Sequence, residues 1–255
     1  MKATTAYVTI LAVPALVLAF EPAVGATDLL VVGGFSRAVE GALPSGWKPQ
    51  IFKKGRDAKQ TVYGVVRDGD TTVVRAESVG AASGLEYEVP VDLREYPVLR
   101  WRWKVDNVVA SGDPRRKDKD DYAARVYVTF AFEPEKVSFG ERLRYKTARR
   151  LFGGVPYAAI SYIWASRTPV GTVVDSPHMG NIVKIIVIES GKARVGDWVA
   201  EERNVYDDYR RAFGKEPPLV SGVAIMTDTD NTQERATAYY GDLVFVKEQT
   251  RALLP

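Results

Sequence analysis

The chain has 255 residues, and its 35 Lys and Arg so nearly balance its 32 Asp and Glu that the formal net charge is only +3. An excess this small gives no reason to expect a nucleic-acid partner. The chain contains no cysteine. This excludes a disulfide framework, a cysteine-ligated zinc site and a lipid anchor attached to cysteine.

The N-terminal segment has the features of a cleaved signal peptide. Lys2 precedes an apolar stretch over residues 6–20, and small residues that suit a cleavage site follow it. A retained membrane anchor is the alternative, but the uncharged run is shorter than the roughly 20 residues that span a bilayer. We therefore predict a signal peptide over residues 1–26 and a single domain over residues 27–255. The domain would be periplasmic or secreted, with no membrane span after cleavage.

Alternation of apolar and polar residues predicts most of the strands. The alternating runs on either side of Asp68-Gly69-Asp70 predict a β-hairpin, because glycine accepts a positive φ in such a turn. Residues 98–106 alternate most clearly and place Trp101 and Trp103 on one face. We favour a core position for the two rings over a platform for a sugar ring, because paired aromatic residues on a strand usually pack inside.

A charged segment, residues 113–121, ends in Asp120 and Asp121 directly before the next alternating strand, residues 122–133. Its positive and negative charges nearly cancel, so we interpret it as a solvated loop. The two aspartates then lie at the mouth of the strand, where binding loops are common. The alternation places Arg125 on the face opposite the apolar residues of this strand.

Two helices are predicted from their capping residues. Ser138 and Glu141 form a capping box that predicts a helix to about Phe152. Its basic residues could touch anionic lipid or polysaccharide, although a helix packed on a sheet with a solvated basic side is the favoured interpretation. Asn204 is a suitable N-cap for a second helix over residues 205–213.

Near the C-terminus, two apolar runs flank an acidic segment that contains Asp228, Asp230 and Asn231. This pattern predicts a β-hairpin whose tip could hold a hard cation or the hydroxyls of a sugar. An EF-hand is excluded because Gln233 and Tyr239 occupy the positions of its glycine and bidentate glutamate. A turn whose Asp and Asn side chains bond to their own backbone is an equally good interpretation.

The order of the elements indicates the fold class. About ten short strands, two helices and no regular alternation of strand and helix predict an all-β fold. The expected architecture is an antiparallel β-sandwich of jelly-roll type with two short accessory helices. No Gly-rich phosphate-binding loop is present.

Four stretches resemble one known family. They are Asp120-Asp121-Tyr122 with RVYVTF, YIWAS with Ser176-Pro177, Trp198 with EERNVYDDYRRAFG, and GVAIMTDTDNT with AYYGDLVF. They are similar to a family of exported bacterial proteins that is classed as a domain of unknown function, DUF3047. The resemblance covers most of residues 27–255 and implies no established activity or catalytic residue.

A looser likeness concerns the ends of the predicted domain. Pro44 to Trp47 and Gly241-Asp242-Leu243 resemble two segments of galactose-binding-type jelly rolls, in which an early acidic residue and a late aspartate often hold a structural calcium. The likeness implies that Glu40 and Asp242 are calcium ligands, at the level of a fold analogy. No cofactor is expected apart from such a calcium.

A hydrolase would need a suitable group of catalytic residues. A glycosidase needs two carboxylates roughly 5–10 Å apart across a cleft. The sequence does not show that any two of its candidate carboxylates face each other; these are Asp120, Asp121, Asp228, Asp230, Glu201 and Glu202. There is no Gly-x-Ser-x-Gly motif, and His178 is the only histidine. A surface or hydrogen-bonded histidine is favoured over a general base at this position.

We therefore predict a non-catalytic, exported β-sandwich that binds a carbohydrate or another polar ligand of the cell envelope. The predicted polar contacts come from Asp120, Asp121, Asp228, Asp230 and Asn231, and the predicted stacking face from Trp164 or Tyr122. Two alternatives stay open, a glycan-active hydrolase or lyase that uses two carboxylates and a periplasmic module that binds another protein. The sequence leaves the ligand and the oligomeric state open.

Overall fold

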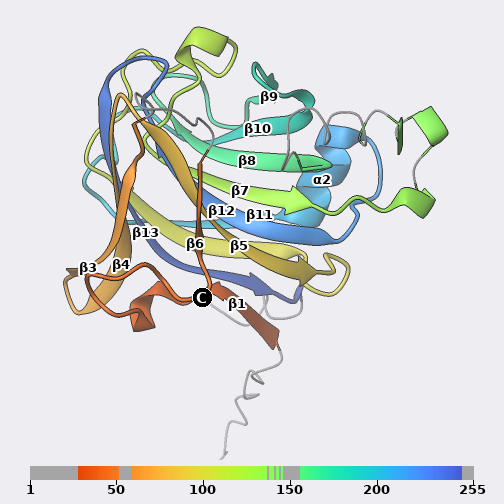
Figure 1. Ribbon diagram of the computed structural model, residues 1–255, viewed down its shortest axis with the longest axis horizontal. Coiled ribbons are helices and arrows are strands. Elements are labelled where there is room, and N and C mark those ends of the chain that lie inside the picture. Colours follow the sequence, from red (N-terminus) through yellow and green to blue (C-terminus); the bar gives the residue numbers. More distant parts are fainter. Residues whose placement is uncertain are drawn as a thin grey trace, which may run out of the picture.

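The computed structural model describes residues 28–51, 59–136, 138–140, 142, 143, 145 and 156–248. In this part of the chain two β-sheets lie face to face (Figure 1). The predicted all-β sandwich of jelly-roll type is confirmed.

The chain passes repeatedly from one sheet to the other. The first sheet has the order β11 (Val199–Asn204), β6 (Val98–Val105), β13 (Arg235–Val246), β4 (Thr71–Val79) and β3 (Val62–Asp68), and β1 (Leu29–Gly33) also pairs with β13. The second sheet has the order β2 (Lys48–Gln50), β5 (Ala82–Val91), β12 (Val220–Asp228), β7 (Arg125–Phe130), β8 (Ala158–Ala165), β10 (Gly180–Ser190) and β9 (Val173–Ser176). Consecutive strands such as β5, β6 and β7 therefore alternate between sheets.

Aromatic rings fill the space between the sheets. Trp101 and Trp103 both point inward from β6, and their rings meet edge to face at 5.6 Å. Trp164, from β8 of the opposite sheet, lies 6.0 Å from the Trp103 ring. The core position predicted for Trp101 and Trp103 is confirmed, and their burial contributes a large share of the hydrophobic stabilisation.

The predicted C-terminal hairpin is wrong. β12 pairs with β5 and β7 in the second sheet, whereas β13 pairs with β1, β4 and β6 in the first. The acidic segment between them therefore connects the two sheets. A second difference concerns β8 and β10, which pair in parallel. Strands that are neighbours in sequence often form a hairpin, which is why β12 and β13 were expected to pair. β12 is almost entirely buried, however, and a strand buried on both faces suits a position inside a sheet, here between β5 and β7.

Short-range predictions hold better. β3 and β4 form the predicted hairpin, with Gly69 at φ 62°. The helix α2 (Val205–Phe213) begins at Asn204, whose side chain accepts a hydrogen bond from the Asp207 amide, and ends at Gly214 with φ 70°. Figure 1 shows α2 at one end of the sandwich. Within the described ranges, the short 3-10 helices η2 (Phe35–Arg37), η3 (Lys117–Lys119) and η4 (Pro134–Lys136) lie in connections.

Some predictions lie outside the described residues. These are the signal peptide over residues 1–26 and most of the helix from Ser138 to Phe152. No helix in the described part of the chain is both long and apolar enough to cross a bilayer.

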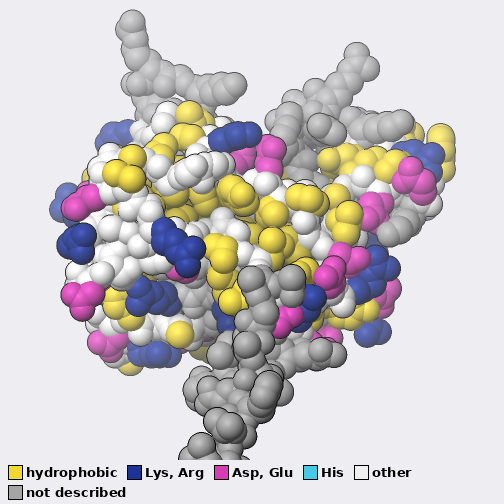
Figure 2. Space-filling model, turned by 90° about the horizontal axis from the view of Figure 1, so that it is seen from below, with side chains coloured by type: hydrophobic (Ala, Val, Ile, Leu, Met, Phe, Trp, Pro, Cys, Tyr) yellow, Lys and Arg dark blue, Asp and Glu magenta, His cyan; other side chains and the backbone are white. Residues whose placement is uncertain are grey.

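The surface seen from below carries charges of both signs. Lys and Arg side chains are interspersed with Asp and Glu, and hydrophobic side chains gather between them (Figure 2). This face therefore has no large patch of one sign, in keeping with the small net charge.

Candidate functional site

A buried arginine organises one end of the sandwich. Arg125, at the start of β7, is 3% exposed. Its Nε donates to Oδ1 of Asp228 at 2.8 Å and its Nη2 to Oδ2 of the same carboxylate, so the pair is bidentate. Its Nη1 donates to Oδ1 of Asp120 at 3.4 Å. Forked geometry of this kind matches guanidinium to carboxylate and makes a strong, directional contact.

Further groups satisfy the same guanidinium. Nη1 donates to the Tyr127 hydroxyl at 3.2 Å, and Nη2 donates to the Asp120 carbonyl. The ring of Tyr122 lies 4.3 Å from the guanidinium carbon, within the range of a cation–π contact. The Tyr122 amide also donates to Asp228 at 3.3 Å. Three predicted site residues, Asp120, Tyr122 and Asp228, thus meet around Arg125.

Asp121 binds the connection between β12 and β13. Its carboxylate accepts hydrogen bonds from the Asn231 amide at 3.0 Å, the Asn231 side chain at 3.0 Å, the Thr232 amide at 2.6 Å and the Thr232 hydroxyl at 2.7 Å. Asp121 is fully buried. A carboxylate with four such donors holds the segment in place. The side chains of Asp228 and Asn231 bond to Arg125 and Asp121 in a distant part of the chain, not to the backbone of their own turn as the turn interpretation expected.

We call Asp120, Asp121, Arg125, Asp228, Asn231 and Thr232 the Arg125 cluster. The sequence nominated four of these residues as ligand contacts and missed Arg125. The signal was present, since an arginine begins a strand of mostly apolar residues four positions after Asp121. The alternation correctly places Arg125 opposite the apolar residues of its strand. It does not show that Asp120, Tyr122 and Asp228, which lie at strand ends and in a loop, cover the guanidinium there.

The charges in the cluster depend on one another. Burial raises the pKa of Asp228 to about 7, and the positive charge of Arg125 opposes that rise. Burial acts to lower the pKa of Arg125, but the neighbouring groups, with Asp228 first among them, together outweigh burial and hold that pKa above its usual range. Arg125 therefore stays charged, and Asp228 relies on it to carry a charge inside the protein.

Among the described residues, the acidic side chains that come nearest to the arrangement of a cation site are Asp121, Asp228 and Asp230. Each has an oxygen within 4.8 Å of the others. However, Asp121 already accepts four hydrogen bonds, and Asp228 is paired with a guanidinium. A hard cation needs free oxygens, so the arrangement fits an internal ion pair better than a metal.

The predicted calcium ligands lie elsewhere. Asp242 accepts hydrogen bonds from the Ser36 amide at 2.7 Å and the Ser36 hydroxyl at 2.6 Å. Glu40 is exposed in the turn that follows η2. The assignment of Glu40 and Asp242 to calcium stays a prediction.

The stacking surface predicted from Trp164 or Tyr122 is not available. Trp164 is 1% exposed, faces the core from the middle of the second sheet, and donates its indole N–H to the Gly191 carbonyl at 3.1 Å. Tyr122 is also 1% exposed and packs beneath Arg125. Rings buried to this degree have no free face for a sugar. His178 lies at the edge of the cluster, with Nε2 3.9 Å from Asp120.

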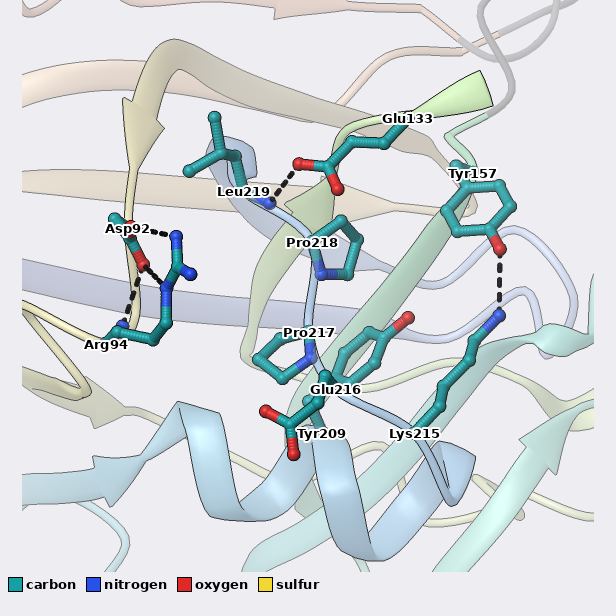
Figure 3. A pocket seen from close by; sticks show the side chains of 10 residues that line it. All are labelled: Asp92, Arg94, Glu133, Tyr157, Tyr209, Lys215, Glu216, Pro217, Pro218 and Leu219. Carbon is teal, nitrogen blue, oxygen red and sulfur yellow. Dashed lines mark hydrogen bonds and ion pairs between the residues drawn. The ribbon is translucent and has the colours of Figure 1, made fainter. Parts of the chain in front are cut away.

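A cavity lies at the opposite end of the sandwich, beside α2, and we call it the α2-end cavity. Its volume is about 270 Å³. It is lined by Asp92, Arg94, Glu133, Tyr157, Tyr209, Lys215, Glu216, Pro217, Pro218 and Leu219. Figure 3 shows the Asp92–Arg94 pair and the Tyr157–Lys215 pair on opposite sides of the segment that carries the two prolines.

Hydrogen bonds hold the lining groups of this cavity in place. Lys215 Nζ donates to the Tyr157 hydroxyl at 2.8 Å, and Arg94 makes a bidentate pair with Asp92 (Figure 3). Glu133 accepts from the Leu219 amide at 3.3 Å. No pattern in the sequence indicates this site, because its residues come from five separate stretches of chain.

Half-buried aromatic rings adjoin the α2-end cavity. Phe132 and Tyr145 stack at 4.2 Å, and both lie within 6 Å of the Tyr157 ring. Aromatic edges beside charged and hydroxyl groups suit a ligand with both polar and apolar faces, as sugars have.

Comparison with known proteins identifies a family. Residues 45–244 match the family described as "Protein of unknown function (DUF3047)". Among proteins with curated descriptions, none matches the chain in sequence.

Three solved structures are similar to the chain over most of its length. One is the family 30 carbohydrate-binding module of a cellulosomal cellulase from Clostridium thermocellum, with 11% identity, TM-score 0.40, and coverage of 86% of this chain and 98% of that one. Another is endoglucanase 3 of family GH12 from Trichoderma harzianum, with 9% identity, TM-score 0.40, and coverage of 88% and 100%. The third is a family 12 xyloglucanase from Bacillus licheniformis, with 12% identity, TM-score 0.38, and coverage of 86% and 94%. Similarity at this level carries no information on ligand or activity.

Proposed function

The chain belongs to the DUF3047 family, and we propose that it binds a carbohydrate, or another small polyhydroxylated ligand of the cell envelope, in the α2-end cavity. In this proposal the protein is exported and binds its ligand without converting it. The proposal keeps the periplasmic or secreted location predicted from residues 1–26, which N-terminal sequencing of the exported protein would check.

One observation carries the proposal. The α2-end cavity combines two tyrosines, two cations and three carboxylates in about 270 Å³, next to the half-buried rings of Phe132 and Tyr145. Sites for small ligands combine apolar walls with a few fixed polar groups. The bonds from Lys215 to Tyr157 and from Leu219 to Glu133 fix such groups before a ligand arrives, which lowers the entropic cost of binding.

Binding is favoured over hydrolysis because the acids of this cavity are already engaged. Asp92 is paired with Arg94, and Glu133 accepts from the Leu219 amide. Glu216 accepts from Arg210 at 3.1 Å and from the Tyr206 hydroxyl. A glycosidase needs one carboxyl group ready to give a proton and a second ready to attack or to activate water. Paired carboxylates are better suited to accept hydrogen bonds from ligand hydroxyls.

A titration of the protein with a panel of soluble glycans tests the proposal. A bound glycan raises the melting temperature, because a ligand at 100 times its Kd adds about 2.7 kcal/mol to the free energy of unfolding. Tyr157→Phe and Glu133→Gln should each weaken the affinity roughly three- to tenfold, as expected for one lost hydrogen bond.

The matched control is Tyr87→Phe. Tyr87 is half-buried and stacks on Trp47 at 5.9 Å, away from the α2-end cavity, so its affinity should match the unmodified protein. Equal affinity in all three variants would contradict the site. Loss of binding in Asp230→Asn alone would instead support the acidic segment predicted from the sequence. Release of shorter glycans during incubation would contradict the non-catalytic role.

A further inference from the structure

A second cavity lies where one edge of the first sheet faces the second sheet, and we call it the lateral cavity. Its volume is about 360 Å³. Val173 of β9 and Ile186 and Ile188 of β10 form an apolar wall, while Glu201 and Arg203 of β11 and Asp208 of α2 add charged groups. The lateral cavity shares no lining residue with the α2-end cavity.

The register of β11 explains why charged groups face this space. Glu201 lies opposite Trp101 on β6, and Arg203 lies opposite Leu99. Directly opposed residues in an antiparallel pair point to the same side of the sheet, and both partners belong to the core. Glu201 and Arg203 therefore point inward from a strand at the edge of its sheet. Inward charges also protect an edge strand from aggregation, but that role needs no cavity.

Most charges in the lateral cavity have partners. Arg203 makes a bidentate pair with Asp208, at 2.9 Å and 2.5 Å. The Tyr162 hydroxyl also donates to Asp208, at 2.8 Å. The outward neighbour of Glu201, Glu202, is paired with Arg100 at 2.8 Å. The charges of these paired groups therefore nearly cancel at the wall of the cavity.

Glu201 is different. Its Oε1 accepts a hydrogen bond from the indole N–H of Trp103 at 3.2 Å, but it has no ion pair within the described residues. Burial and the nearby charge of Glu189 raise the pKa of Glu201 to about 7. A cation beside Glu201 would supply the missing counter-charge, and the apolar wall would cover the rest of such a ligand.

We propose that the lateral cavity binds a small organic cation, with its protonated nitrogen paired to Glu201 and its hydrocarbon body against Val173, Ile186 and Ile188. The cavity volume lies at the lower end of the roughly 300–1,000 Å³ typical of small-molecule sites, which suits a primary amine with one ring. Glu201 supplies the charge recognition, and the apolar wall supplies most of the buried area.

Calorimetric titration of the full chain with benzylamine and cyclohexylamine tests this proposal. Benzyl alcohol and cyclohexanol serve as neutral ligands of similar shape. We expect both amines to bind and both alcohols to bind at least tenfold more weakly. Amine binding should also shift the NMR signal of the Trp103 indole N–H, because that group bonds to the same carboxylate.

Two variants and one control complete the test. Glu201→Gln keeps an acceptor for Trp103 but removes the charge, and should weaken amine binding at least tenfold. Ala212→Leu, on α2, fills part of the lateral cavity and should weaken amines and alcohols alike. Glu86→Gln makes the same change at a half-buried glutamate of β5, which lines neither cavity, and should leave binding unchanged.

Three outcomes would overturn the proposal. They are the absence of amine binding at millimolar concentration, equal affinity for amines and alcohols, and full amine affinity in Glu201→Gln. Circular dichroism and the melting temperature of each variant show whether it is folded, so that a loss of binding can be separated from a loss of structure.

Discussion

Arg116 and Arg125 make bidentate ion pairs of similar length in very different surroundings. Arg116 pairs with Asp118 on an exposed loop, whereas Arg125 and Asp228 are almost completely buried. Exposed pairs contribute about 0–1 kcal/mol, because water screens them and side-chain entropy opposes them. Breaking a buried pair leaves a charge without compensation and costs about 3–5 kcal/mol.

We therefore expect Arg125→Gln to lower the free energy of unfolding by about 3–5 kcal/mol. Arg116→Gln is the matched control and should leave it essentially unchanged, because water already screens this exposed pair. Urea unfolding followed by tryptophan fluorescence measures both. Similar values for the two variants would show that the Arg125 cluster does not stabilise this end of the sandwich as its contacts indicate.

Glu201 makes stability depend on pH. Its pKa is raised to about 7 in the folded protein by burial and by Glu189, although the indole of Trp103 and the charges of Arg194 and Arg203 act in the opposite direction. A group with a raised folded pKa favours the folded state at low pH, and this contribution is lost as pH rises from the unfolded value, near 4.5, through the folded value.

Between pH 5 and pH 8, we expect this carboxyl group to reduce stability by about 1–2 kcal/mol, roughly half of what the full shift would give, because solvent still reaches it. Glu201→Gln should remove that part of the decline. Urea unfolding at several pH values checks the slope. Parallel curves for the variant and the unmodified protein would contradict the assignment.

At the scale of elements, the residues that begin and end a helix were predicted reliably from the sequence, whereas the pairing of strands was not. Asn204 and Gly214 marked the ends of α2 correctly because capping acts within one turn of helix. The segment from β12 to β13 looked like a hairpin, yet the two strands belong to different sheets. Which strand pairs with which depends on contacts far apart in sequence. Arg125 and Asp228 lie 103 positions apart in the sequence, so their pairing is hidden for the same reason.

The N-cap of α2 gives a prediction at this scale. Asn204 accepts a hydrogen bond from the Asp207 amide at 3.0 Å. Asn204→Ala should lower the free energy of unfolding by about 1 kcal/mol, because one amide loses its partner, whereas Asn204→Asp should retain the bond and the stability. Urea unfolding of the two variants distinguishes these results.

The same substitution tests how α2 serves the two cavities. Tyr209 of α2 lines the α2-end cavity, and Asp208 lines the lateral cavity. Fraying of the first turn in Asn204→Ala should therefore weaken a ligand at either site modestly, by less than tenfold. Unchanged affinities together with unchanged stability would show that the cap bond does not position the helix.

At the scale of the whole molecule, the two ends of the sandwich have different roles. The Arg125 cluster closes one end with internal bonds, and α2 closes the other end over a cavity. The sequence predicted the sandwich and nominated most residues of the first end, because acidic residues near strand ends are visible as a pattern. The sequence could not show that the carboxylates of these residues accept hydrogen bonds from within the protein, because the donors are Arg125 and the amides of Asn231 and Thr232.

Calcium and chelator distinguish an internal cluster from a metal site. Because Asp121 and Asp228 already bond to N–H donors, we expect the melting temperature in calcium and in chelator to agree within about 1 °C, well below the 2–4 °C that 1 kcal/mol produces in a domain of this size. A calcium-dependent rise that Asp230→Asn abolishes would contradict the internal role of the acidic segment. A rise that only Asp242→Asn abolishes would support the calcium predicted for Glu40 and Asp242. Such a rise would leave the Arg125 cluster unaffected, because Asp242 bonds to Ser36, outside that cluster.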